Sequence, residues 1–98
     1  MSMLIDFSIF PMDKGTRVSP YVARVVDIIR KSGLDHQFGP MGTSIEGHWT
    51  EVMAVVECCF EALQADCERI YFTIKADYRQ NADHRLQGKV RSVESKLT

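Results

Sequence analysis

Residues 38–47, Phe-Gly-Pro-Met-Gly-Thr-Ser-Ile-Glu-Gly, constrain the fold most, because they separate two helical patterns and cannot belong to either. Pro40 has no backbone N–H to give to a helix, and the three glycines add conformational freedom. The stretch therefore predicts two short strands joined by a tight turn, in which Gly42 takes a conformation that a Cβ would forbid. Taken alone, it favours a plain hairpin over a ligand-binding loop.

Alternating apolar residues predict two longer strands, residues 3–10 and residues 69–77. The mixed face of the first strand carries Leu4, Asp6, Ser8 and Phe10. The core-facing set of the second strand is Ile70, Phe72, Ile74 and Ala76. The opposite face of the second strand is polar and aromatic like the mixed face of the first. Such faces are typical of a surface that a ligand or another subunit covers.

Helical periodicity predicts two helices that flank the hairpin. The first begins at Ser19, which can cap it, and Pro20, and it ends at Gly33. The second runs from about residue 48 to residue 65. A third helix is expected after Asp83, which can cap it. Its narrow apolar stripe, suited to docking onto a neighbour or onto the edge of the domain, is Leu86, Val90, Val93 and Leu97.

The element order β-α-β-β-α-β predicts an α+β, ferredoxin-like domain over residues 1–98, with an extra C-terminal helix. Both main helices are expected on one face of an antiparallel sheet. Leu4, Phe10 and Tyr71 would then be exposed on the opposite face, so we expect association between subunits to bury much of it.

Charge and composition narrow the function classes. A formal net charge of -1 gives no electrostatic reason to expect nucleic acid or an anionic membrane as partner. No apolar run approaches the roughly 20 residues of a membrane span, and the first residues do not resemble a signal peptide. The three cysteines lack C-x-x-C spacing and are interpreted as buried or half-buried apolar residues. Free thiols fit a cytoplasmic location.

The sequence contains no motif typical of catalysis or of metal binding. The histidines, at 36, 48 and 84, share no metal-ligand spacing, so neither a metal nor another cofactor is expected. Ser8 lacks a Gly-x-Ser-x-Gly elbow, and neither a dinucleotide-binding nor a Walker pattern occurs.

A binding site on the open sheet face remains as a hypothesis. Asp6 or Glu46 could hold a cationic ligand, while Ser8 and Thr43 could hydrogen-bond a heteroaromatic ring. The aromatic side chains that could stack on the ring are Phe10, Phe38 and Tyr71. Interface polar groups and cross-strand pairs, such as Lys75 with Asp77 or Asp6, account for the same residues slightly better.

Several stretches recur together, in order, over nearly the whole chain. They are Phe7-Ser8-Ile9-Phe10-Pro11, Ser19-Pro20-Tyr21-Val22, Ser32-Gly33-Leu34, Pro40-Met41-Gly42-Thr43 with Glu46-Gly47, and Thr73-Ile74-Lys75-Ala76-Asp77 with Arg79. Together they resemble the thiamine-binding protein family of small, cytoplasmic, ferredoxin-like proteins, which includes the YkoF-like proteins. The start of the second helix, His48-Trp49, departs from the family pattern.

The resemblance implies binding of thiamine or of its hydroxymethylpyrimidine part, and no catalytic step. It also implies assembly through the sheets into a homotetramer, a dimer of dimers. Carried onto this sequence, the family's ligand-binding positions are Ser8, Thr43, Glu46, Lys75 and Asp77.

Three functions are therefore open. The leading one is a non-enzymatic binding protein, acting as a carrier or buffer of thiamine or a related pyrimidine. The second is a small enzyme that uses a carboxylate such as Glu46 or Asp6 as its base. The third is a structural or regulatory homo-oligomeric domain without a small ligand.

Overall fold

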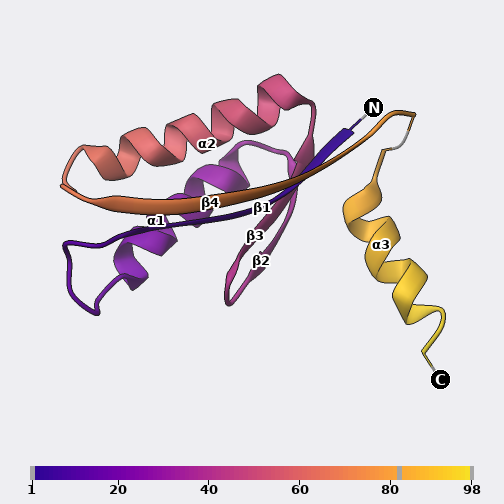
Figure 1. Cartoon of the computed structure of the whole chain (residues 1–98), viewed down its shortest axis with the longest axis horizontal. Coiled ribbons are helices and arrows are strands. Elements are labelled where there is room, and N and C mark those ends of the chain that lie inside the picture. The colour runs from indigo at the N-terminus through magenta and orange to yellow at the C-terminus, as the bar shows by residue number, and fades with distance from the viewer. Residues whose placement is uncertain (1, 82, 98) are drawn as a thin grey trace.

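The structure, a computed structural model that describes residues 2–81 and 83–97, has the element order β-α-β-β-α-β followed by one more helix. The strands are β1 (Ser2–Pro11), β2 (Asp35–Gly39), β3 (Gly42–Gly47) and β4 (Ile70–Arg79), and the helices are α1 (Ser19–Lys31), α2 (Trp49–Gln64) and α3 (Arg85–Glu94). The strands form one antiparallel sheet in the order β2-β3-β1-β4 (Figure 1). The predicted ferredoxin-like α+β fold is confirmed.

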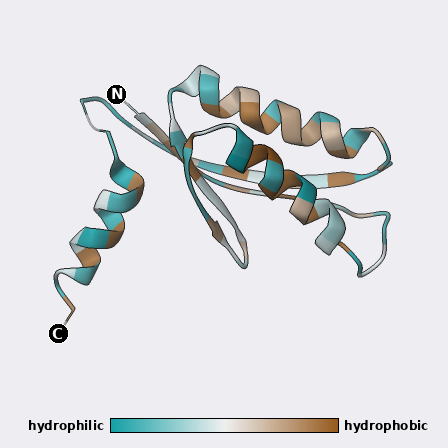
Figure 2. Ribbon diagram, turned by 180° about the vertical axis from the view of Figure 1, so that it is seen from behind, coloured by the Kyte–Doolittle hydropathy of each residue, from teal (hydrophilic) through white to brown (hydrophobic). Residues whose placement is uncertain are grey.

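The hydrophobic core lies between the sheet and the two helices α1 and α2. Ile5 of β1 pairs directly with Ile45 of β3, and both are almost fully buried. Ile29 of α1 and Val52 of α2 close over them with no exposed surface. Each such side chain contributes roughly 1.5–3 kcal/mol when it is fully buried. Figure 2 shows hydrophobic residues along α1 and α2, whereas much of α3 is hydrophilic.

The two main helices begin differently. At α2, the backbone N–H of His48 donates to Glu51 Oε1 at 3.0 Å, which is half of a capping box. At α1, the prediction that Ser19 caps the helix is wrong. Ser19 is already helical, the N-cap is Val18, and no side chain caps the helix. Pro20, which has no N–H, leaves one fewer amide to satisfy there.

The turn between β2 and β3 consists of Pro40 and Met41, with Gly39 paired to Gly42. The prediction of a special backbone conformation at Gly42 is wrong, because Gly42 has no positive φ. A Cβ at Gly42 would instead lie 3.0 Å from the carbonyl oxygen of Phe7 and 3.1 Å from Asp6 Oδ1. Glycine is therefore needed so that the start of β3 can approach β1 closely.

β4 is an edge strand, and its burial differs from the prediction. Phe72 is 46% exposed and Ala76 is exposed, while Ile70 and Ile74 are only half-buried. The reason is that α1 and α2 pack mainly against β1, β2 and β3, so β4 has little cover. The rings of Phe60 and Phe72, 6.2 Å apart, make the main aromatic contact between α2 and β4.

Two of the three cysteines are buried, and Cys58 is exposed, contrary to the prediction for that residue. Burial raises the pKa of the Cys59 thiol to about 12, so this thiol stays protonated. None of the helices in the described residues is long and apolar enough to cross a membrane.

Candidate binding pocket

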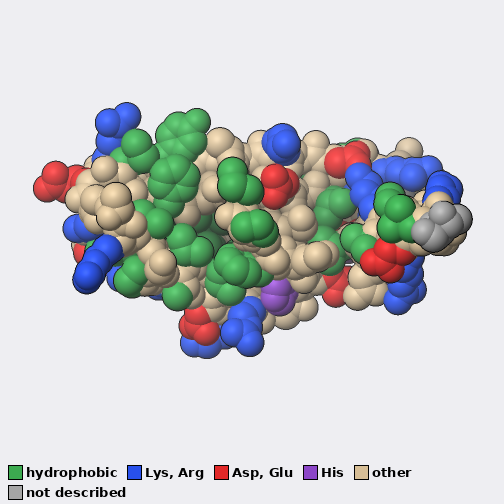
Figure 3. All heavy atoms as spheres, turned by 90° about the horizontal axis from the view of Figure 1, so that it is seen from below, with side chains coloured by type: hydrophobic (Ala, Val, Ile, Leu, Met, Phe, Trp, Pro, Cys, Tyr) green, Lys and Arg blue, Asp and Glu red, His purple; other side chains and the backbone are tan. Residues whose placement is uncertain are grey.

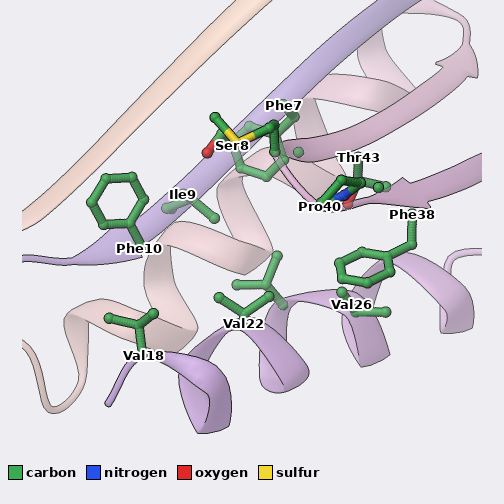
Figure 4. Close-up of a pocket in the computed structure, with 14 residues that line it drawn as sticks. Phe7, Ser8, Ile9, Phe10, Val18, Val22, Val26, Phe38, Pro40 and Thr43 are labelled. Atoms are coloured by element: carbon green, nitrogen blue, oxygen red, sulfur yellow. The ribbon is translucent and has the colours of Figure 1, made fainter. Parts of the chain in front are cut away.

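A pocket of about 250 Å³ lies between α1, the end of β1 and the tip of the β2–β3 hairpin. Its lining residues are Phe7, Ser8, Ile9, Phe10, Val18, Val22, Val25, Val26, Phe38, Gly39, Pro40, Met41, Gly42 and Thr43. In Figure 4, Val18, Val22 and Val26 line one side, facing β1, and Phe10 and Phe38 lie at opposite ends. Figure 3 shows hydrophobic side chains gathered over this part of the molecule.

The pocket exists because β3 is shorter than β1. The pairing of β1 with β3 ends at Phe7 and Thr43, although β1 continues to Pro11. The hairpin turn and α1 enclose the space that a longer β3 would fill. Pro40 and Gly42, which make the hairpin short and tightly apposed, therefore also shape the pocket.

The same early end of β3 leaves part of the β1 backbone facing the pocket. In an antiparallel sheet, every second residue turns its N–H and C=O toward a given neighbouring strand. β1 pairs with β4 along its whole length, but beyond Phe7 it has no strand on its other side. Among Ser8, Ile9 and Phe10, at least one residue therefore presents a backbone donor and acceptor toward the pocket.

Two residues that carry hydroxyl groups line the pocket, and their side chains lie on opposite faces of the sheet, since Thr43 pairs with Phe7 and Ser8 follows Phe7 along β1. Thr43 is only 5% exposed, and Ser8 is half-buried. Within residues 2–81 and 83–97, neither hydroxyl has a hydrogen-bond partner. No side-chain oxygen or nitrogen of these residues is fully buried without a partner, so the Thr43 hydroxyl keeps some contact with solvent. Both hydroxyls remain available to a ligand.

Among the residues that the structure describes, no charged side chain lines the pocket. The histidines and cysteines also lie elsewhere, and no cluster of His, Cys, Asp and Glu in the described part of the chain could hold a metal ion. An uncharged, largely apolar pocket favours a neutral ring over an isolated ion, because an ion would lose its hydration without gaining a partner.

Glu46 and Asp77 lie at the other end of the sheet, about 13 Å from Ser8 along β1. Leu4 pairs with Glu46 on one side and with Asp77 on the other, which places both carboxylates in one row. Glu46 is 5% exposed and accepts hydrogen bonds from the backbone N–H groups of Arg85 and Leu86, at 2.8 and 3.0 Å. The Glu46 carboxylate therefore holds the start of α3.

Arg85 completes this attachment of α3. Its buried guanidinium donates to Ser2 Oγ at 3.1 Å, to the Ser2 carbonyl at 2.9 Å and to Asp77 Oδ2 at 2.8 Å. Lys89 Nζ donates to the same Asp77 oxygen at 2.7 Å. The hydrogen bond from Lys89 holds the pKa of the Asp77 carboxyl below its usual value.

The pKa of Glu46 is also lowered. Burial acts to raise it, but the hydrogen bonds from the amides of Leu86 and Arg85 favour the charged form and prevail. The prediction that Asp83 caps α3 is wrong, because the N-cap is His84, in the left-handed conformation, without a side-chain cap bond. Instead, the Glu46 carboxylate, which lies outside the helix in β3, accepts hydrogen bonds from its first amides.

The five predicted site residues are thus divided among three places. Ser8 and Thr43 meet at the pocket, and Glu46 and Asp77 meet at the start of α3. Lys75 lies between them on β4, exposed and opposite Asp6. Within the described residues, Lys75 has no ion pair with either aspartate that the sequence proposed for it.

Sequence reasoning missed one wall of the pocket. Val18, Val22 and Val26 follow an i, i+4 row beside the buried residues Val25 and Ile29. This row of valines, which ends opposite the exposed Phe38, is the feature of the sequence from which the pocket wall could have been predicted.

Comparison with known proteins finds the same family over most of the chain. The family model described as "Thiamine-binding protein" matches residues 5–94. The UPF0045 protein Mb1933 of Mycobacterium bovis is 40% identical and covers 99% of this chain and 96% of its own length. The UPF0045 protein sll0230 of Synechocystis is 35% identical and covers 99% of this chain and 81% of its own length.

Solved structures show the same fold. The hypothetical protein MJ1052 of Methanocaldococcus jannaschii superposes with a TM-score of 0.87 at 25% identity, covering 95% of this chain and 96% of that one. A Thermotoga maritima protein, provisionally described as a thiamine biosynthesis/salvage protein, superposes with a TM-score of 0.84 at 20% identity. It covers 95% of this chain and 99% of its own.

Proposed function

Because the chain belongs to the thiamine-binding protein family, we propose that it is a non-enzymatic binding protein for thiamine or its hydroxymethylpyrimidine half. The observation that carries this proposal is the uncharged pocket with two unpartnered hydroxyls, Ser8 and Thr43. The family description and the provisional description of the Thermotoga maritima neighbour support a small-ligand-binding role.

The chemistry of the pocket matches an aminopyrimidine. Such a ring carries an amino donor and a ring-nitrogen acceptor side by side on one edge. A β-strand residue presents a complementary N–H and C=O, and each hydroxyl can donate or accept. The ring edge binds the exposed β1 backbone and the hydroxyls of Ser8 and Thr43. Its apolar faces pack against Val22 and Val26.

Size and charge favour the pyrimidine half as the buried group. The pocket volume of about 250 Å³ lies just below the roughly 300 Å³ at which pockets for drug-sized ligands begin. The thiazolium of thiamine is cationic, and Glu46, the carboxylate expected to meet it, is occupied by α3. The cationic ring therefore lies outside the pocket, toward solvent.

The residues that line the pocket also disfavour the alternative of a small enzyme with a carboxylate base. Among the described residues, no carboxylate, imidazole, amine or thiol lines the pocket, and Asp6, the nearest carboxylate named as a possible base, lies beside Gly42 without lining it. A ligand incubated with the protein and recovered unchanged would support binding without turnover. We further propose a cytoplasmic carrier or buffer role. A homotetramer and ligand binding by Lys75 also remain predictions.

The first test is calorimetric titration with hydroxymethylpyrimidine and with thiamine, on the parent protein and on Thr43→Val. Valine keeps the shape of threonine but removes the hydroxyl, so we expect affinity to fall about tenfold for a lost hydrogen bond of about 1.4 kcal/mol. The matched control is Thr50→Val, at an exposed position of α2 outside the pocket, and its affinity should be unchanged. No binding of either ligand, or equal losses in both variants, would overturn the proposal.

A further inference from the structure

A second pocket, of about 270 Å³, lies at the end of the molecule where β1 and α2 begin and β4 ends (Figure 1). Its lining residues are Ser2, Met3, His48, Trp49, Thr50 and Tyr78. It shares no residue with the pocket that Ser8 and Thr43 line, and the proposed function does not use it. His48 and Trp49, which depart from the pattern of the family, therefore line a cavity of their own.

The fold brings two aromatic side chains to this second pocket from separate elements. Tyr78 of β4 pairs directly with Met3 of β1, so their side chains share one face of the sheet. Because Met3 belongs to the hydrophobic core, this is the face that α1 and α2 cover. Trp49 is the first residue of α2. Trp49 and Tyr78 are 60% and 54% exposed, so both keep accessible ring surface at the pocket.

The lining of the second pocket is aromatic and uncharged. Among the described residues, no Asp, Glu, Lys or Arg lines it. The faces of Trp and Tyr rings carry negative electrostatic potential and attract cations, Trp most strongly. A primary ammonium group would need hydrogen-bond acceptors for its three N–H groups, and no carboxylate of the lining supplies them. A quaternary ammonium group has no N–H and meets no such cost.

The surroundings of the second pocket supply negative charge. A hollow of about 250 Å³ adjoins it, because Ser2 and His48 line both. In the described part of the chain, no Lys or Arg lines this hollow, whereas four carboxylates do. The carboxylates belong to Asp35, Glu46, Glu51 and Asp83.

The positive groups nearby do not cancel this charge in the second pocket. The Arg85 guanidinium donates to the Asp77 carboxylate at 2.8 Å. At the positive end of α2, the Glu51 carboxylate accepts a backbone N–H at 3.0 Å. Arg79 follows Tyr78 in β4, so its side chain leaves the opposite face of the sheet. A cation in the pocket is therefore attracted by its aromatic walls and by its surroundings.

We propose that the second pocket binds a quaternary ammonium group, whose methyl groups pack against the faces of Trp49 and Tyr78. The adjoining carboxylates supply the counter-charge without contacting the group. The volume of about 270 Å³ suits a small ligand, because it lies below the roughly 300 Å³ at which pockets for drug-sized ligands begin. The inference does not rest on the proposed function, because the two pockets have no residue in common.

The test uses choline as the probe and the fluorescence of Trp49 as the readout. Trp49 is the only tryptophan of the chain, so a change in its emission reports on this pocket. Choline is titrated at constant ionic strength, and so is neohexyl alcohol, in which a carbon atom replaces the charged nitrogen. We expect a saturable change with choline and binding about tenfold weaker with the uncharged alcohol.

Two tyrosine variants locate the binding. Tyr78→Leu removes one aromatic wall and should weaken choline binding about fivefold. The matched control is Tyr71→Leu, which changes a tyrosine of β4 that is 52% exposed but outside the pocket, and its affinity should be unchanged. Calorimetric titration of Trp49→Leu checks the other wall and should show the larger loss. The proposal would be overturned by no saturable change with choline, by equal binding of the alcohol, or by equal losses in the two tyrosine variants.

Discussion

At the scale of single residues, Glu46 shows how one buried charge links distant parts of the chain. Its carboxylate, in β3, accepts hydrogen bonds from two α3 amides 39 and 40 residues away. The first amides of a helix lack partners within the helix and carry partial positive charge, so a carboxylate is well suited to them. Glu46 thereby caps a helix to which it does not belong.

We predict that Glu46→Gln loosens α3. Glutamine has the same shape but replaces one acceptor oxygen with an NH₂ group, which faces a backbone donor. The loss should be about 1–3 kcal/mol, because one buried amide is left unsatisfied. Hydrogen exchange of the amides of residues 85–94 should become correspondingly faster. Glu68→Gln, an exposed change of the same charge, is the control; equal exchange in the two variants would contradict the assignment.

At the scale of elements, α3 is weakened by a glycine within it. Gly88 has no positive φ, and a Cβ added there would meet nothing within 4 Å. Gly88→Ala should therefore stabilise α3 by about 1 kcal/mol, through helix propensity alone. We expect slower hydrogen exchange in α3 and higher helicity by circular dichroism. Gly33→Ala is the contrasting control. It also has open space around it, but its φ of +77° makes alanine strained.

The same scale separates what sequence could predict from what it could not. The strands and the two main helices follow from local periodicity, such as Ile5, Phe7 and Ile9 on one face of β1, and these predictions are confirmed. Burial of β4 depends on which strands the helices cover, and the cap of α3 depends on a residue in β3. Such non-local contacts leave no periodic signal. For the same reason, five residues expected in one site occupy three places.

At the scale of the whole molecule, lowered carboxylate pKa values connect segments that are far apart in sequence. Asp13, through the amide of Glu68, ties the loop after β1 to the start of β4. Asp66, through the side chain of Arg24, ties the end of α2 to α1. Glu46 and Asp77 tie α3 to the sheet. Each contact favours the ionised carboxylate in the folded state, which lowers its pKa.

The sign of the resulting pH dependence follows from linkage. A carboxyl group whose pKa is lower in the folded state stabilises the fold above its unfolded pKa, about 3.8 for Asp and 4.5 for Glu. This contribution is lost as pH falls through the folded pKa. We therefore predict a nearly constant unfolding free energy from about pH 7 to 5, and a steady fall below about pH 4.5, measured by urea denaturation. If instead the unfolding free energy rose on acidification, the assignment would fail.

Glu46→Gln isolates one contributor to this pH dependence. The variant lacks the ionisable group, so the difference in unfolding free energy between it and the parent protein should be largest near pH 7. It should shrink as the parent's Glu46 becomes protonated below its lowered pKa, because a protonated carboxyl and an amide make similar hydrogen bonds. If urea unfolds α3 before the rest of the molecule, the parent protein and Glu46→Gln are compared instead by the hydrogen-exchange rates of the amides of residues 85–94. A difference that stays constant from pH 7 to pH 3 would mean that the charge of Glu46 contributes nothing to holding α3.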